Sequence, residues 1–145
     1  MPRFKAAIDI DAPREHVFAL AADPLKQPEW TTWIKEATVT AGDARSVGTR
    51  ERTVIKIGPQ RKAHDVEWTD YRPNEVLGRR FTGYLDVKER LTFTPANGGT
   101  RVVWDIDYVP PFGILGKLGA WFMMARIFQN ELEASLENLK AALES

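Results

Sequence analysis

The sequence contains no cysteine, which excludes disulfides, thiolate nucleophiles and metal sites built on thiolates. This absence fits a reducing compartment, and we expect the protein to be cytoplasmic. Only two histidines are present, too few for a histidine-rich metal cluster, so we expect neither a metal nor another cofactor. Lysine plus arginine and aspartate plus glutamate number 20 each, and this balance gives no electrostatic basis for binding nucleic acid.

Long hydrophobic runs are also missing. No apolar segment approaches the roughly 20 residues that span a bilayer, so we expect no integral membrane segment. The first residues lead directly into an alternating pattern, without the apolar core of a signal peptide. What remains is a chain of 145 residues that is 43% hydrophobic, which predicts one globular domain over residues 1–145.

Alternating patterns predict strands over much of the chain. In residues 4–11, Ile8 and Ile10 alternate with Asp9 and Asp11, as in a half-buried strand. Six further strands, separated by glycine, proline and asparagine turns, are predicted at about 34–40, 49–57, 62–71, 76–83, 87–94 and 100–109. Two short helical segments, at about 13–21 and 25–29, are predicted between the first two strands.

A long helix is predicted over residues 115–143. Its apolar side chains follow a spacing of three and four, which is typical of a helix that packs one stripe on a sheet. The second half has an acidic outer side and is interpreted as a structural clamp. The first half is apolar on several sides and is weakened by Gly116 and Gly119, so we interpret it as the movable wall of a cavity.

Several local motifs occur in a characteristic order: Ile8-Asp-Ile10-Asp-Ala-Pro13 before Val17-Phe18, Asp23-Pro24 with Trp30, Phe93-Thr-Pro95-Ala-Asn-Gly98-Gly-Thr100, and Leu136-Glu-Asn-Leu139-Lys140. With this order the chain resembles the START-like (SRPBCC) superfamily, especially its polyketide cyclase/dehydrase and lipid-transport branch. The resemblance implies an α+β helix-grip fold, similar to START and Bet v 1 proteins. In it, a seven-stranded curved antiparallel sheet surrounds the C-terminal helix, and two short helices follow the first strand.

The leading functional hypothesis is binding or carriage of a hydrophobic small molecule, such as a lipid, a polyketide or an aromatic compound, between sheet and helix. Aromatic side chains offer broad apolar faces to such a ligand, although the same residues can simply fill a core. The candidate ligand-binding residues are Trp33, Trp68, Leu91, Phe93, Trp104, Tyr108, Leu118, Phe122 and Arg126.

The alternative is a cyclase- or dehydratase-like enzyme that uses the same pocket. His64 shares strand parity with Trp68, so its imidazole could move a proton on a bound carbonyl, or its nitrogens could be satisfied by the backbone. Glu51 could point inward, where it would need a counter-charge such as Arg126 or Arg90, or it could lie at the rim, which is the placement we favour for both arginines. These are the candidate catalytic residues, His64 and Glu51.

The third hypothesis concerns the apolar edge from Pro110 to Phe128. Such an edge could form a protein interaction surface, including a weak homodimer contact, or touch a membrane. Only Lys117 and Arg126 carry positive charge there, which gives little attraction to an anionic bilayer. We therefore favour a gate or pocket wall at this edge.

Overall fold

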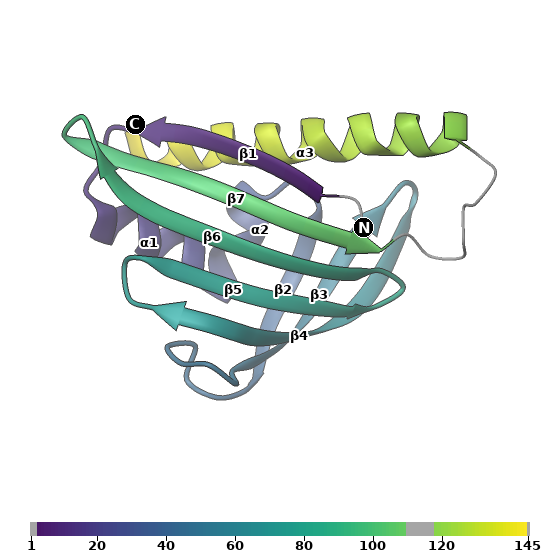
Figure 1. Ribbon diagram of the computed structural model, residues 1–145. Helices are drawn as coiled ribbons and strands as arrows, with labels where there is room; N and C mark the ends of the chain where they lie inside the picture. The colour runs from purple at the N-terminus through teal and green to yellow at the C-terminus, as the bar shows by residue number, and fades with distance from the viewer. Residues whose placement is uncertain (1–2, 110–117, 145) are drawn as a thin grey trace.

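The computed structural model describes residues 3–109 and 118–144, in which one curved sheet packs against a long helix (Figure 1). Within these residues the sheet has seven antiparallel strands in the spatial order β1-β7-β6-β5-β4-β3-β2. The elements are β1 (Arg3–Ile10), α1 (Arg14–Ala22), the 3-10 helix η1 (Pro24–Lys26), α2 (Gln27–Trp30), β2 (Ile34–Ala41), β3 (Arg50–Ile57), β4 (Gln60–Arg72), β5 (Val76–Gly83), β6 (Asp86–Ala96), β7 (Gly99–Val109) and α3 (Leu118–Glu144). The predicted fold class is confirmed.

Turn chemistry explains why neighbouring strands along the chain pair with each other. The β6–β7 hairpin is closed by Asn97 and Gly98, and both residues have positive φ, at 50° and 82°. A two-residue loop of this kind matches the right-handed twist of the strands, and Asn-Gly is its favoured sequence. Successive hairpins of this meander bring β2 and β1 to the two edges of the sheet.

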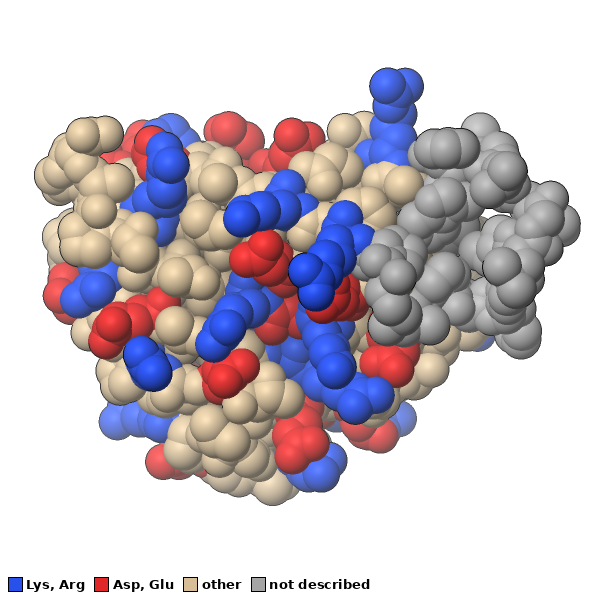
Figure 2. Space-filling model, in the orientation of Figure 1, with Lys and Arg blue, Asp and Glu red and all other residues tan. Residues whose placement is uncertain are grey.

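The outer face of the sheet is covered by charged side chains of both signs, which lie intermixed in Figure 2. Many of these side chains form cross-strand ion pairs, such as Arg101 with Asp9 at 2.8 Å and Arg80 with Asp86 at 3.1 Å. Exposed pairs of this type each contribute only about 0–1 kcal/mol to stability. The core lies on the opposite, concave face, which α3 covers.

Helix α3 buries the stripe that the sequence predicts, since Leu132, Leu136 and Leu139 are each at most 1% exposed. Its polar side chains bond to both edges of the open sheet. On one edge Lys140 donates to the backbone oxygen of Asp9, at 2.8 Å. Near the other edge, Asn138 donates to the backbone oxygen of Trp30 at the end of α2, and Ser135 accepts from the backbone of Thr32. The helix therefore bridges β1 and the segment before β2.

The predicted start of this helix at Leu115 lies outside the described residues. No helix in residues 3–109 and 118–144 combines the length and hydropathy that crossing a bilayer requires.

Candidate functional site

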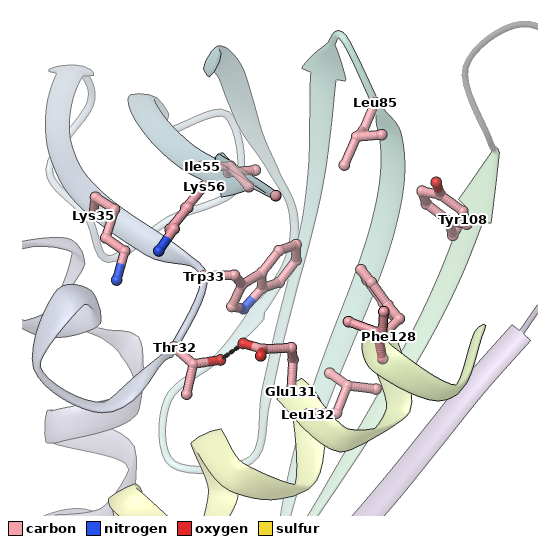
Figure 3. Close-up of a pocket in the computed structure, with 12 residues that line it drawn as sticks. Thr32, Trp33, Lys35, Ile55, Lys56, Leu85, Tyr108, Phe128, Glu131 and Leu132 are labelled. Atoms are coloured by element: carbon pink, nitrogen blue, oxygen red, sulfur yellow. Dashed lines mark hydrogen bonds between the residues drawn. The ribbon is translucent and has the colours of Figure 1, made fainter. Parts of the chain in front are cut away.

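A pocket of about 620 Å³ lies between α3 and the sheet (Figure 3). Its size falls within the range of about 300–1,000 Å³ that is typical of small-molecule sites. The described lining comes from the α2–β2 connection, strands β2, β3 and β7, two turns and α3: Thr32, Trp33, Lys35, Ile55, Lys56, Gly58, Leu85, Tyr108, Ile127, Phe128, Glu131 and Leu132. The pocket is therefore built by segments that are far apart in the sequence.

Phe128 is the centre of the apolar wall. Its ring stacks on Tyr108 with centroids 5.3 Å apart, and it meets Trp33 edge-on at 5.4 Å. A third ring, that of Phe4 on β1, lies 4.9 Å from it. Aromatic pairs at these distances add stability beyond the area they bury. The wall is thus held by ring contacts from β1, β7, α3 and the α2–β2 connection.

The polar side of the pocket is organised by Thr32. Its hydroxyl donates to the carboxylate of Glu131, and its backbone N–H donates to Ser135 Oγ at 2.9 Å. Both partners lie on α3, one turn apart. These bonds attach the helix to the chain segment that carries Trp33, and so fix the separation between the two sides of the pocket.

His64 lies outside the pocket lining and holds one of the turns that form it. Its Nε2 accepts a hydrogen bond from the backbone N–H of Leu85 at 3.0 Å, so Nδ1 carries the proton and donates to the backbone oxygen of Lys62 at 3.1 Å. Burial lowers the pKa of His64 from its ordinary value of 6.5. The imidazole is therefore held neutral, and it fixes the turn that presents Leu85 to the pocket.

This arrangement predicts a pH-dependent stability. Because the pKa of His64 is lower in the folded protein than in the unfolded chain, its contribution is complete above pH 6.5 and is lost as the pH falls through the folded pKa. His64→Gln keeps an acceptor for Leu85 without a titrating group. In urea unfolding between pH 8 and pH 5, we expect the wild type to lose more stability than this variant. Parallel pH profiles for the two proteins would contradict the assignment.

A second polar group lies deeper, on the concave face of the sheet. Arg79 pairs with Glu89 through Nε at 2.6 Å and through Nη2, and with Glu51 through Nη1 at 3.4 Å. Two tryptophan N–H groups complete the row, since Trp68 donates to Glu51 and Trp104 donates to Glu89. All three charged side chains are fully buried. We call this row the buried ion cluster.

Burial and mutual charge act against each other in the buried ion cluster. Burial raises the pKa of Glu89, although the nearby Arg79 guanidinium opposes this effect. Burial also acts to lower the pKa of Arg79, but the charges of Glu89 and Glu51 outweigh it and raise that pKa. The guanidinium therefore stays charged and is the counter-ion on which both carboxylates depend.

The counter-charge of the inward carboxylate is neither of the two arginines considered from the sequence, and the rim placement favoured for both agrees with their exposure. Both Arg126 and Arg90 are exposed, and the partner is Arg79. The sequence contains a signal for this residue, because Arg79 alternates with Leu77 and Phe81, which both point into the core. An arginine at an apolar position of a strand is unusual unless it is paired.

Of the predicted ligand-binding residues, Trp33 and Tyr108 line the pocket. The others that the structure describes lie elsewhere: Trp68, Leu91, Phe93 and Trp104 are buried in the core outside the lining, and Arg126 is exposed outside it. The side chains of Leu118 and Phe122 lie outside the described part of the chain. Neither His64 nor Glu51 belongs to the lining.

The polar members of the lining carry no clear signal in the sequence, and Lys35 and Lys56 are the basic ones. Lys35 lies at a β-bulge between Ile34 and Glu36, where strand alternation gives no guide to direction. Within residues 3–109 and 118–144, no group of three or more histidine and acidic side chains is arranged to hold a metal ion.

Solved structures share this fold over almost the whole chain. A START superfamily protein from Mycobacterium smegmatis matches with a TM-score of 0.81 at 17% identity, covering 98% of this chain and 97% of the other. A protein from Thermus thermophilus matches with a TM-score of 0.80 at 24% identity, covering 99% and 100%. The protein Ara h 8.0201 matches with a TM-score of 0.72 at 9% identity, covering 98% and 97%.

At the level of sequence, no curated protein matches the chain significantly. The family profile described as polyketide cyclase/dehydrase and lipid transport, however, matches residues 1–144. This match confirms the resemblance proposed from the motifs. The chain belongs to the polyketide cyclase/dehydrase and lipid transport family.

Proposed function

We propose that the protein binds a hydrophobic small molecule in the pocket between α3 and the sheet. The observation that carries this proposal is a largely apolar pocket of about 620 Å³, whose lining includes the buried side chains of Trp33, Ile55 and Leu132. Membership of a family described by lipid transport and polyketide chemistry supports the same class of ligand. The binding energy would come chiefly from removing the ligand's apolar surface from water.

The contacts of His64 and Glu51 do not favour the proton-transfer alternative. Both ring nitrogens of His64 are occupied by backbone groups, and Glu51 is held in the buried ion cluster. A general acid or base must reach the substrate through a hydrogen bond or one water. Neither side chain lines the pocket, so the geometry favours binding over proton transfer.

Ile127 offers a test of the pocket at low cost to folding. It lines the pocket and is 55% exposed, so Ile127→Asp places a carboxylate at the apolar wall without emptying the core. We expect the affinity for the neutral fluorescent probe N-phenyl-1-naphthylamine to fall by about tenfold, because a charge disfavours an apolar ligand beside it. The affinity is measured by fluorescence titration.

Val47→Asp is the matched control, since Val47 is 60% exposed and lies outside the lining. It should retain the affinity of the wild type. Circular dichroism should show that both variants are folded. If the wild type does not bind the probe, or if both variants bind it equally well, the pocket is not the binding site.

A further inference from the structure

Some polar side chains of the pocket lining have hydrogen-bond partners within the described part of the protein, and others do not. Thr32 and Glu131 are bonded to each other, and Thr32 also binds Ser135 through its backbone. Trp33, in contrast, is only 6% exposed, and its indole N–H finds no acceptor among the described residues. A buried donor without an acceptor is costly and needs an explanation.

The two lysines of the lining also lack an anionic partner among the described residues, although Lys35 is only partly buried and Lys56 is exposed. Neither Lys35 nor Lys56 forms an ion pair within residues 3–109 and 118–144. The segment 110–124 contains no aspartate or glutamate that could supply one. The residue opposite Lys56 on β4 is Arg61, which adds another positive charge nearby. The ammonium groups therefore lack a protein carboxylate.

The buried indole N–H of Trp33 and the two unpaired ammonium groups of the described lining are all donors. An indole N–H and an ammonium group can donate hydrogen bonds but cannot accept them. Of the lining residues, Lys35 and Lys56 are basic and only Glu131 is acidic, so their combined formal charge is positive by one unit. This set is complementary to an acceptor that carries a single negative charge.

The position of these groups makes the pocket amphipathic. The backbone N–H of Lys56 bonds to the backbone oxygen of Trp33 at 2.8 Å, so the two lysines lie on adjacent strands beside Trp33. Figure 3 shows Lys35 and Lys56 on one side of Trp33, and Tyr108 and Phe128 on the other. One end of the pocket is therefore basic and the other end is aromatic.

We propose that the ligand is an amphipathic carboxylic acid. Its carboxylate is bound by Lys35, Lys56 and the Trp33 N–H, and its apolar body lies against Phe128 and Tyr108. Hydrogen bonds between charged donors and a carboxylate are among the stronger ones in proteins. This inference rests on the proposed function and adds the chemical class of the ligand's polar end.

The test compares decanoate with decanol, which have the same chain length and differ in charge at pH 8. Each competes with N-phenyl-1-naphthylamine in fluorescence displacement. We expect the wild type to prefer decanoate by about tenfold. Lys35→Met/Lys56→Met should lose this preference, and Trp33→Phe should lose part of it. Lys26→Met/Lys88→Met, which removes two exposed lysines outside the lining, is the control and should keep the preference.

Three results would overturn the proposal. Equal displacement by decanoate and decanol, with the probe bound, would refute the anionic head group and leave the proposed function intact. A preference for decanoate that survives Lys35→Met/Lys56→Met would refute the role of these lysines. No binding of the probe or of either competitor would refute the proposed function itself.

Discussion

Arg79→Met is expected to lower the free energy of unfolding by about 3–5 kcal/mol, because it leaves two core carboxylates without their shared counter-charge. Replacing a guanidinium by an apolar side chain does not create a large cavity, so most of the loss would be electrostatic. Urea unfolding followed by circular dichroism measures it. Arg80→Met is the matched control, since the neighbouring Arg80 is an exposed arginine on the opposite face and pairs with Asp86.

We expect the control to lose at most about 1 kcal/mol, as is usual for an exposed ion pair. A second variant separates charge from packing. Combining Arg79→Met with Glu51→Gln and Glu89→Gln removes both unpaired carboxylates and should recover much of the loss, since a neutral core row no longer needs a counter-ion. Equal losses for the Arg79 and Arg80 variants would show that the buried ion cluster does not stabilise the fold.

Leu136→Ala is expected to cost about 2–5 kcal/mol, through lost burial and the cavity left behind. Leu136 is 1% exposed at the centre of the apolar stripe of α3, and it lies outside the pocket lining. Folded Leu136→Ala should therefore bind N-phenyl-1-naphthylamine as the wild type does, under conditions where urea unfolding shows the variant to be native.

The neighbouring Glu137→Ala is the control for this change, because Glu137 is exposed on the opposite side of α3. It should alter stability by less than about 0.5 kcal/mol. A large loss of probe affinity in folded Leu136→Ala would contradict the division of α3 into a structural stripe and a pocket wall.

The strands and α3 were predictable because local patterns alone specify them. Leu136 and Leu139 keep helical spacing, and Asn97-Gly98 is a hairpin signal that depends on two adjacent residues. The observed strands begin and end close to the predicted residues for the same reason. Backbone propensity and burial agree throughout these segments.

The pocket was less predictable because its residues occupy places where alternation stops applying. Lys35 lies at a β-bulge, Lys56 precedes the turn after β3, and Leu85 lies in the turn before β6. Strand alternation predicts that the side chains of Lys56 and Ile55 point to opposite faces of the sheet, yet both residues line the pocket. The curvature of the sheet and the position of α3 decide which strand ends come together. A local sequence pattern gives no information about either.

Partner choice in the buried ion cluster has a similar origin. Strand parity allowed Glu51 to point inward or to lie at the rim. The structure places it inward, and its counter-charge is 28 positions away, on the second strand along the sheet. Arg90 cannot pair with Glu51, because two strands lie between them and Arg90 is on the outer face of the sheet. That choice depends on the assembled sheet rather than on any one segment.

The pairing of β1 with β7 has a consequence for the order of folding. Arg3 pairs with Asp107, and Ile10 with Thr100, so the first strand meets a partner about 100 residues later in the chain. At about 5–20 residues per second, a ribosome needs on the order of 5–20 s to make that partner. The hairpins from β2 to β6 join sequence neighbours and can form before β7 is made. During synthesis β1 therefore stays without its sheet partner until β7 has been made.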